Sequence, residues 1–211
     1  IRLSLVGSEM CIRDRVNVLA GVTFESGLRA LLRQDPDIIM VGETRDAETA
    51  SISVRAAITG HLVFSTLHTN DSVSSVIRLV DMGLESYMIA NSLVGVVAQR
   101  LMRKVCPYCA QAEEPTEEER EFLERDIHRV MRPKGCRYCN NTGYKGRTAI
   151  HEILTIDREI REMISRRATM EEVKDYATDR QGMRTLKECG VDLVEAGVTT
   201  MEELMKVAYY A

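Results

Sequence analysis

The sequence predicts an α/β fold with a parallel sheet, followed by a mostly helical region around a set of cysteines. Two hydrophobic segments, 38–41 and 61–67, read as strands and alternate with amphipathic helices. This alternation is typical of parallel strands joined by crossover helices. Beyond Arg103 the elements become short and charged. Hydrophobic residues make up 45% of the 211 residues and charged residues 28%, which excludes a wholly disordered chain.

The first elements follow from capping residues and chain breakers. Thr23 can cap a helix that ends before the turn 33–37, where Pro36 disfavours helical angles. Residues 38–41 are all apolar, which predicts a strand buried on both faces. Asp46 then begins a helix that Gly60 can end.

The next segments continue the alternation. A second strand covers 61–67, and a helix from about Asn70 to Met82 is closed by Gly83. The apolar residues 87–102 have no polar face, which predicts a buried helix capped by Ser86.

Helix-start signals dominate the second half. The capping box Thr116-x-x-Glu119 opens an acidic helix to about Val130, and 143–146 form a tight turn between extended pieces. The remaining predicted helix starts are Asp157, the box Thr169-x-x-Glu172 and the box Thr200-x-x-Glu203.

Charge and hydropathy exclude two function classes. The net charge is −4 and the pI about 5.7, whereas a general nucleic-acid binder needs a cationic surface. The most apolar segment is too short and too interrupted to span a membrane. A reducing cytosol is therefore the expected compartment, where paired cysteines more often hold metal than form disulfides.

The cysteines provide the strongest chemical signal. Cys106 and Cys109 form one C-x-x-C pair, and Cys136 and Cys139 form a second. Two such pairs can complete the tetrahedral shell of a structural Zn²⁺, with no open position for catalysis. Two disulfides or a redox C-x-x-C are the alternatives, and the matched pairs favour zinc. Cys11 and Cys189 have no partner pair and read as ordinary thiols.

An acidic residue follows the first predicted strand. Gly42 and Glu43 come directly after 38–41, the layout of a Walker B element in which the acid holds Mg²⁺ or polarises water beside a nucleotide. The alternative is that Glu43 and Asp46 are helix-entry residues that favour the positive end of a helix dipole.

The second strand places a histidine near each of its ends. His61 stands at its start and His68 just past its end. Loops that follow parallel strands line the ligand crevice of α/β folds, so Glu43 and His68 are expected to face one site. An imidazole there can donate to a phosphate oxygen.

Together these segments resemble the secretion ATPase superfamily, the hexameric motors of type II secretion and type IV pilus assembly. The resemblance runs from about Val16 to the end. It is carried by the Walker B region 31–43, the histidine box 60–71, the four paired cysteines, and the segments 142–147 and 182–186. The tetracysteine motif favours the assembly and secretion motors over the pilus-retraction motors, which lack it.

The resemblance implies a role for each site residue. Glu43 would be the catalytic glutamate that activates or orients water, and Gly42 and Arg45 belong to the same motif. His61 and His68 would be the histidine-box residues, with His68 the γ-phosphate contact. The implied cofactors are ATP with Mg²⁺ and a structural Zn²⁺.

The sequence also departs from the family. No G-x-x-x-x-G-K-[ST] phosphate loop occurs in it, so an incomplete RecA-like P-loop NTPase core is expected, inactive on its own. Residues 1–15 match nothing in the family and resemble translated sequencing adapter, a non-native segment. The expected domains are 16–103 for the ATPase core, 104–150 for a zinc subdomain and 151–211 for a helical subdomain.

The implied parent is a cytoplasmic hexamer, peripheral at the inner membrane through a platform protein. No transmembrane segment and no nucleic-acid partner are expected for it. The alternative function is a stand-alone zinc-binding interaction module without ATPase activity.

Overall fold

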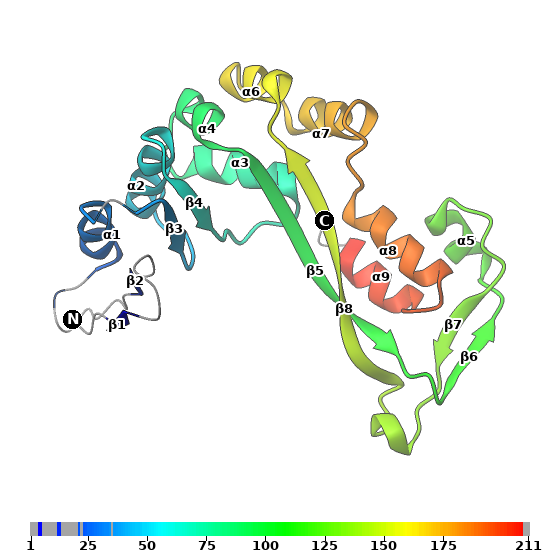
Figure 1. The fold of residues 1–211 in the computed structure, drawn as a ribbon. Coiled ribbons are helices and arrows are strands. Elements are labelled where there is room, and N and C mark those ends of the chain that lie inside the picture. The colour runs from blue at the N-terminus through cyan, green and yellow to red at the C-terminus, as the bar shows by residue number, and fades with distance from the viewer. Residues whose placement is uncertain (1–3, 6–11, 14–20, 22, 35, 209–211) are drawn as a thin grey trace. The chain divides into compact units, whose positions relative to one another are not determined.

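A computed structural model describes residues 4–5, 12–13, 21, 23–34 and 36–208 of the chain (Figure 1). These residues divide into two compact units. The first comprises the described part of Ile1–Thr69 with Ser74–Val94 and Ile156–Val173. The second comprises Asn70–Val73, Gly95–Thr155 and the described part of Lys174–Ala211.

The first unit contains a two-stranded parallel sheet and the helices around it. Its main elements are α1 (Phe24–Leu32), β3 (Ile38–Val41), α2 (Ala47–Ile58), β4 (Leu62–Ser65), α4 (Ser86–Ser92) and α6 (Arg158–Ser165). Two-residue strands β1 (Ser4–Leu5) and β2 (Ile12–Arg13) pair antiparallel. The helices α3 (Ser72–Asp81) and α7 (Met170–Asp179) contribute residues to both units. The expected parallel pairing of β3 with β4, joined through the helix α2, is confirmed.

Local capping sets the helix boundaries in this unit. Thr23 caps α1 by accepting from the Ser26 amide at 3.1 Å, and Asp46 caps α2 by accepting from the Thr49 amide at 2.8 Å. Gly60, with φ of +107°, turns the chain after α2 into β4. These starts lie where the sequence predicts them.

One predicted property of β3 is wrong. Ile39 and Val41 are buried against α1 and α2, but Ile38 and Met40 are 62% and 77% exposed. Leu62 and Phe64 on the paired strand are exposed as well. Among the described residues nothing covers that apolar face, so a strand that is apolar on both faces is buried on only one.

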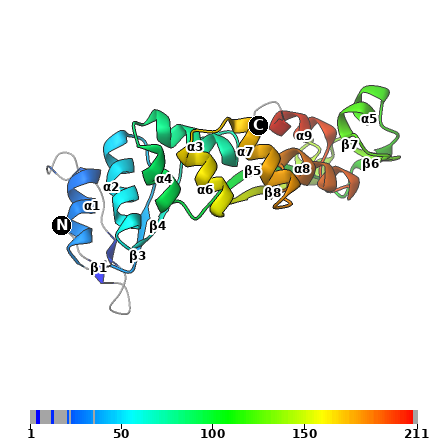
Figure 2. The same ribbon diagram turned by 90° about the horizontal axis from the view of Figure 1, so that it is seen from above.

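The second unit is organised around a long antiparallel ribbon. It pairs β5 (Gly95–Val105) with β8 (Tyr144–Thr155), with Gly95 opposite Thr155 (Figure 1). In Figure 2, α8 (Leu186–Glu195) and α9 (Met201–Ala208) lie along this ribbon. They bury one ribbon face, which supplies Ala98, Met102 and Ile150 to the core.

An arm extends from the ribbon beyond the cysteines. It consists of β6 (Ala110–Glu113) paired antiparallel with β7 (Val130–Pro133), and α5 (Glu117–Leu123) connects the two strands. The turn η2 (Arg137–Cys139) carries the second cysteine pair. The Thr116–Glu119 capping box forms as predicted, but α5 ends at Leu123 because Glu124 turns left-handed at φ of 52°.

The predicted helix 87–102 is correct only as far as Ser92, and Ser86 is the first residue of the helix instead of its cap. The helix α4 stops at Ser92, Leu93 is extended, and 95–105 form strand β5. The β-branched Val94, Val96 and Val97 favour extended backbone, and pairing with β8 supplies the hydrogen bonds. The cysteine region is therefore built on strands, and the mostly helical part begins after β8.

Candidate functional site

Two loops that follow parallel strands meet at one edge of the sheet in the first unit. β3 and β4 pair in register from Ile38 opposite Leu62 to Val41 opposite Ser65, so their carboxyl ends coincide. The Thr44 amide donates to the Thr66 carbonyl at 2.9 Å, and the Thr66 hydroxyl donates to the Gly42 carbonyl at 2.7 Å. These bonds fix the backbone on both sides of Glu43.

Glu43 is the centre of a charged cluster at this edge. Its Oε1 lies 2.6 Å from Nη2 of Arg45, and its Oε2 lies 3.3 Å from Nε2 of His68. The hydrogen bond from Arg45, with a smaller contribution from His68, lowers the pKa of Glu43. A carboxylate held ionised beside an imidazole can accept a hydrogen bond from water.

The two acidic residues of this loop have different local roles. Both carboxylate oxygens of Asp46 bind Thr49, one through its amide and the other through its hydroxyl. Asp46 is therefore the helix-entry residue. Glu43 makes no such cap and instead faces His68.

The two histidines lie at opposite ends of β4. His68 joins Glu43 at the carboxyl end, as the parallel arrangement predicts. His61 precedes the strand, where its Nδ1 lies 3.0 Å from the Ala56 carbonyl and 3.3 Å from the Thr59 hydroxyl. These contacts fasten the end of α2 to the start of β4, so a nucleotide contact by His61 stays a prediction.

The four paired cysteines meet at one end of the ribbon in the second unit. All four sulfur atoms lie within 4.8 Å of one another. Individual Sγ–Sγ distances are 3.9 Å for Cys106 with Cys136, 3.8 Å for Cys109 with Cys139, and 3.7 Å for Cys136 with Cys139. A tetrahedron with Zn–S bonds of about 2.3 Å has edges of about 3.8 Å. The donor set therefore fits zinc, and the spacings are too long for disulfides.

Burial and hydrogen bonding act differently on two of the sulfur atoms. Burial opposes ionisation of Cys139, but amides of Cys136 and Gly143 donate to its sulfur, both at 3.2 Å, and its pKa falls to about 6. Burial raises the pKa of Cys109 to about 12, and the neighbouring sulfurs add to the rise. Four thiolates so close together require a cation between them.

One buried carboxylate was missed from the sequence. Glu152, on the inward face of β8, is 2% exposed. Its Oε1 accepts from the Ser72 amide at 2.9 Å and the Ser72 hydroxyl at 2.6 Å, and its Oε2 accepts from the Leu186 amide at 3.3 Å. Glu152 thus caps the first residues of α3 and α8 together. Its only signal in the sequence is its alternation with Ile150 and Leu154.

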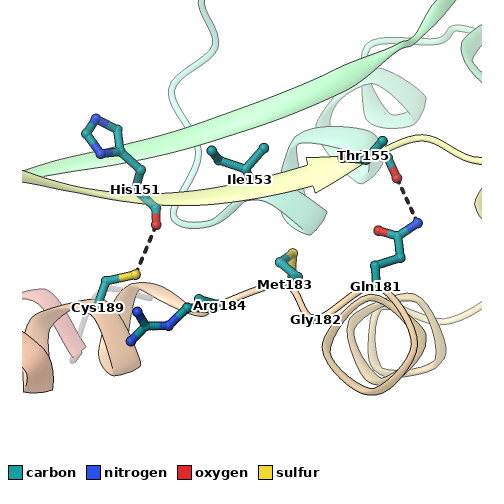
Figure 3. Close-up of a pocket in the computed structure, with 8 residues that line it drawn as sticks. All are labelled: His151, Ile153, Thr155, Gln181, Gly182, Met183, Arg184 and Cys189. Atoms are coloured by element: carbon teal, nitrogen blue, oxygen red, sulfur yellow. Dashed lines mark hydrogen bonds between the residues drawn. The ribbon is translucent and has the colours of Figure 1, made fainter.

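A pocket of about 300 Å³ lies between β8 and the segment before α8 (Figure 3). The Cys189 thiol donates to the His151 carbonyl at 3.3 Å, and Gln181 donates to the Thr155 carbonyl at 3.1 Å (Figure 3). Burial raises the pKa of the Cys189 thiol, so it stays protonated at neutral pH. Cys189 is partly buried and packs against the core of the second unit. Cys11 lies outside the described residues.

The described part of the chain contains no helix that is both long and apolar enough to cross a bilayer. The chain matches, over residues 8–206, the family model described as type II/IV secretion system protein, so the match begins within the segment 1–15, where none was expected. Over 198 residues it is 49% identical to the type IV pilus assembly ATPase PilB of Thermus thermophilus, covering 92% of this chain and 22% of that protein. It is 45% identical to the type II secretion system ATPase E of Vibrio cholerae, covering 92% of this chain and 39% of that protein. The chain therefore spans about two fifths or less of the length of these relatives.

Solved structures agree on the fold. The pilus retraction motor PilT with bound ADP superposes with a TM-score of 0.62 at 28% identity, over 88% of this chain and 43% of that one. The Legionella pneumophila ATPase DotB superposes with a TM-score of 0.60 at 25% identity, over 90% of this chain and 43% of that one. Its α/β fold and its relatives agree: the chain belongs to the type II/IV secretion system protein family.

Proposed function

We propose that the chain is the C-terminal part of a hexameric motor ATPase whose parent drives type IV pilus assembly or type II secretion. The observation that carries this proposal is the pairing of Glu43 with His68 at the carboxyl ends of two adjacent parallel strands. Relatives named as pilus assembly and secretion ATPases support the same reaction class.

In the proposed reaction Glu43 orients the attacking water and accepts a hydrogen bond from it. Bound ATP with Mg²⁺ would supply the electrophilic γ-phosphate. His68, whose Nε2 lies 3.3 Å from the Glu43 carboxylate, would contact that phosphate. Arg45 keeps Glu43 ionised, Gly42 lies in open space at the strand end, and His61 holds the start of β4.

The cysteine cluster has a structural role in this proposal. Cys106, Cys109, Cys136 and Cys139 would hold Zn²⁺ and so fix the end of the ribbon to the arm. With four sulfur ligands the ion has no open position, so it takes no part in hydrolysis.

The remaining features of the parent are proposals as well. It would act as a cytoplasmic hexamer held at the inner membrane through a platform protein, with no nucleic-acid partner. Its ATPase core would include 16–103, followed by the zinc subdomain 104–150 and the helical subdomain 151–211. The boundary at 103 falls inside β5, whereas the compact units divide at Gly95.

The chain on its own is expected to hydrolyse no ATP, because it lacks the glycine-rich loop and lysine that hold the phosphates. Turnover by the purified chain would contradict this expectation. Sequencing the locus upstream of Val16 tests the alternative of a stand-alone zinc module: an in-frame phosphate loop there excludes that alternative.

The direct test replaces Glu43 by Gln in a protein that contains the phosphate loop. Nucleotide should still bind, since the shape of the side chain is kept, while turnover falls by about 10²-fold or more. Glu159→Gln on α6 removes an exposed carboxylate of the same unit and serves as the matched control. Undiminished turnover in Glu43→Gln would remove the catalytic assignment.

A further inference from the structure

Strand β8 is bonded to β5 along one edge, and the described part of the chain places no strand on its other edge. The amide of Ile156, the residue after β8, donates to the Val94 carbonyl and so faces the β5 side. Successive residues of an antiparallel strand direct their backbone groups to opposite sides. The N–H and C=O groups of His151, Ile153 and Thr155 therefore lie on the free edge of β8.

Two of these three residues already have a side-chain partner for the carbonyl oxygen. The Cys189 thiol donates to the His151 carbonyl at 3.3 Å, and the Gln181 amide donates to the Thr155 carbonyl at 3.1 Å (Figure 3). Between these two caps, the N–H and C=O groups of Ile153 have no hydrogen-bond partner among the described residues. A strand edge with an open donor and an open acceptor is a template for a further strand.

The pocket of about 300 Å³ lies at this edge and is lined by Ile153 (Figure 3). Its volume is at the lower end of the range for ligand-binding pockets. Oε1 of Gln181 is buried and has no hydrogen-bond partner in the described structure. In Figure 3 this oxygen points toward the middle of the lining residues, while the amide nitrogen points to Thr155. A buried acceptor without a donor costs free energy, which an N–H brought by an occupant would recover.

The ribbon face turned away from α8 and α9 is apolar beside this edge. Ile153 and its cross-strand partner Val97 are 58% and 60% exposed on that face. Side chains alternate between the two faces of a strand, so a residue added opposite Ile153 would place its side chain beside Ile153. An apolar, β-branched side chain there would extend the exposed pair into a row of three.

We propose that this pocket binds an extended segment of a partner polypeptide, about three residues long, which adds to β8 as a third strand of the ribbon. Its central residue, apolar and β-branched, would exchange two backbone hydrogen bonds with Ile153, and a further N–H would meet Gln181. The caps from Cys189 and Gln181 set the length of the segment, because 151–155 spans about 13 Å.

Two other occupants match the site less well. A second copy of β8 would bring carbonyl groups that are capped in the same way, and in both copies Gln181 stands beside the edge. A small apolar molecule would leave the Ile153 N–H and the Gln181 oxygen without partners. An extended peptide supplies donors and acceptors for both.

The experiment titrates the ¹⁵N-labelled 211-residue chain, in Zn²⁺-containing buffer, with acetyl-Thr-Val-Thr-amide and follows the amide resonances by NMR. The Ile153 amide should shift downfield, with a dissociation constant of about 1 mM. When about nine tenths of the chain is bound, hydrogen exchange of this amide should slow about tenfold, because only the free tenth exchanges. The side-chain amide of Gln181 should shift as well, whereas that of the exposed Gln111 on β6 should not.

A modified peptide gives the matched control without any change to the protein. Methylation of the central valine nitrogen keeps the side chains but removes the donor for the Ile153 carbonyl. This peptide should bind at least about tenfold more weakly, since it loses one hydrogen bond and cannot pair closely with the edge.

Variants of β8 test the same bonds from the protein side. Ile153→Pro removes the N–H on the free edge, where proline is tolerated, and should weaken binding at least about tenfold. Ile153→Ala keeps that N–H and should weaken binding about fivefold or less. Ala149→Pro removes an N–H from the same edge outside the pocket and should change binding about twofold or less. Circular dichroism checks that every variant is folded.

Three outcomes overturn the proposal. The first is equal binding of the methylated and unmethylated peptides, which would assign the pocket to apolar side chains alone. The second is absence of any shift at Ile153 with about 10 mM peptide and the folded chain. The third is self-association of the chain that Ile153→Pro abolishes, which would assign the edge to a second copy. None of these assays needs nucleotide, so their failure is separate from failure of the Glu43→Gln test.

Discussion

Glu203 on α9 anchors the ribbon to the helices that cover it. It is 7% exposed, and its carboxylate accepts from the Arg103 guanidinium at 2.7 Å and from the Arg103 amide at 3.0 Å. Lys206 donates to the same carboxylate at 2.9 Å. Burial opposes ionisation of Glu203, but these donors outweigh it and lower its pKa to about 2.

The lowered pKa sets the size and the pH dependence of the stabilisation. A fall from 4.5 to about 2 corresponds to about 3 kcal/mol, reduced to about 2–3 because the Arg103 side chain is partly open to solvent. A carboxylate whose pKa is lowered by folding stabilises the fold fully when the pH is above its pKa in the unfolded chain, 4.5. The stabilisation is lost as the pH falls toward 2, and less than half of it remains at about pH 3.

The perturbation is Glu203→Gln, followed by urea unfolding with circular dichroism at about pH 7 and about pH 3. The variant should lose about 2–3 kcal/mol at the higher pH and at least about 1 kcal/mol less at the lower pH. Glu202→Gln, on the exposed side of the same helix, should cost about 0.5 kcal/mol or less. Equal losses for Glu203→Gln at both pH values would refute the ion-pair reasoning.

Three further perturbations probe the remaining contacts. Cys136→Ser, or a chelator, should release one Zn²⁺ per chain, which a colorimetric zinc indicator detects. The cysteine region should then unfold, because structural zinc sites contribute about 10–16 kcal/mol to folding. An unchanged circular dichroism spectrum would contradict this. Glu152→Ala leaves buried amides at two helix starts unpaired and should cost about 2–4 kcal/mol in urea unfolding; a loss below about 1 kcal/mol would show that water replaces the carboxylate. Gly190→Ala should cost about 1–3 kcal/mol, because its Cβ would collide with the Leu204 side chain. Gly27→Ala meets nothing within 4 Å and should stabilise α1 by about 0.5–1 kcal/mol. Equal melting shifts for the two glycine variants would reject this packing argument.

The features that were predicted correctly depend on local chemistry. Thr23, Asp46 and Thr116 cap helices through residues three positions away, and the cysteine pairs are recognisable from spacing alone. The contact between Glu43 and His68 was also predicted correctly, because the carboxyl ends of parallel strands lie at one edge of the sheet.

The features that were missed depend on partners distant in sequence. An apolar run without a polar face fits a buried helix and a buried strand equally, and only pairing with β8 decides that 95–105 is a strand. Glu152 could not be recognised, because its partners Ser72 and Leu186 are brought to it by packing. The alternating burial along β3 could not be predicted, because Ile38 and Met40 are apolar but are exposed in the described structure.

The register of the ribbon affects how insertions and deletions in this part of the chain can be tolerated during evolution. Gly95 pairs with Thr155, and Ile156 donates to the Val94 carbonyl at 3.0 Å, so the polypeptide leaves and returns at a single point. Residues 95–155, with the arm and the cysteine cluster, are topologically a side branch. A gene could lengthen or shorten the outer part of such a branch in one event and still join the flanking helices across the same short gap, whereas losing all of it would remove Ala98, Met102 and Ile150 from the core of α8 and α9. The cysteine cluster is thus a module that evolution can vary without rerouting the rest of the chain.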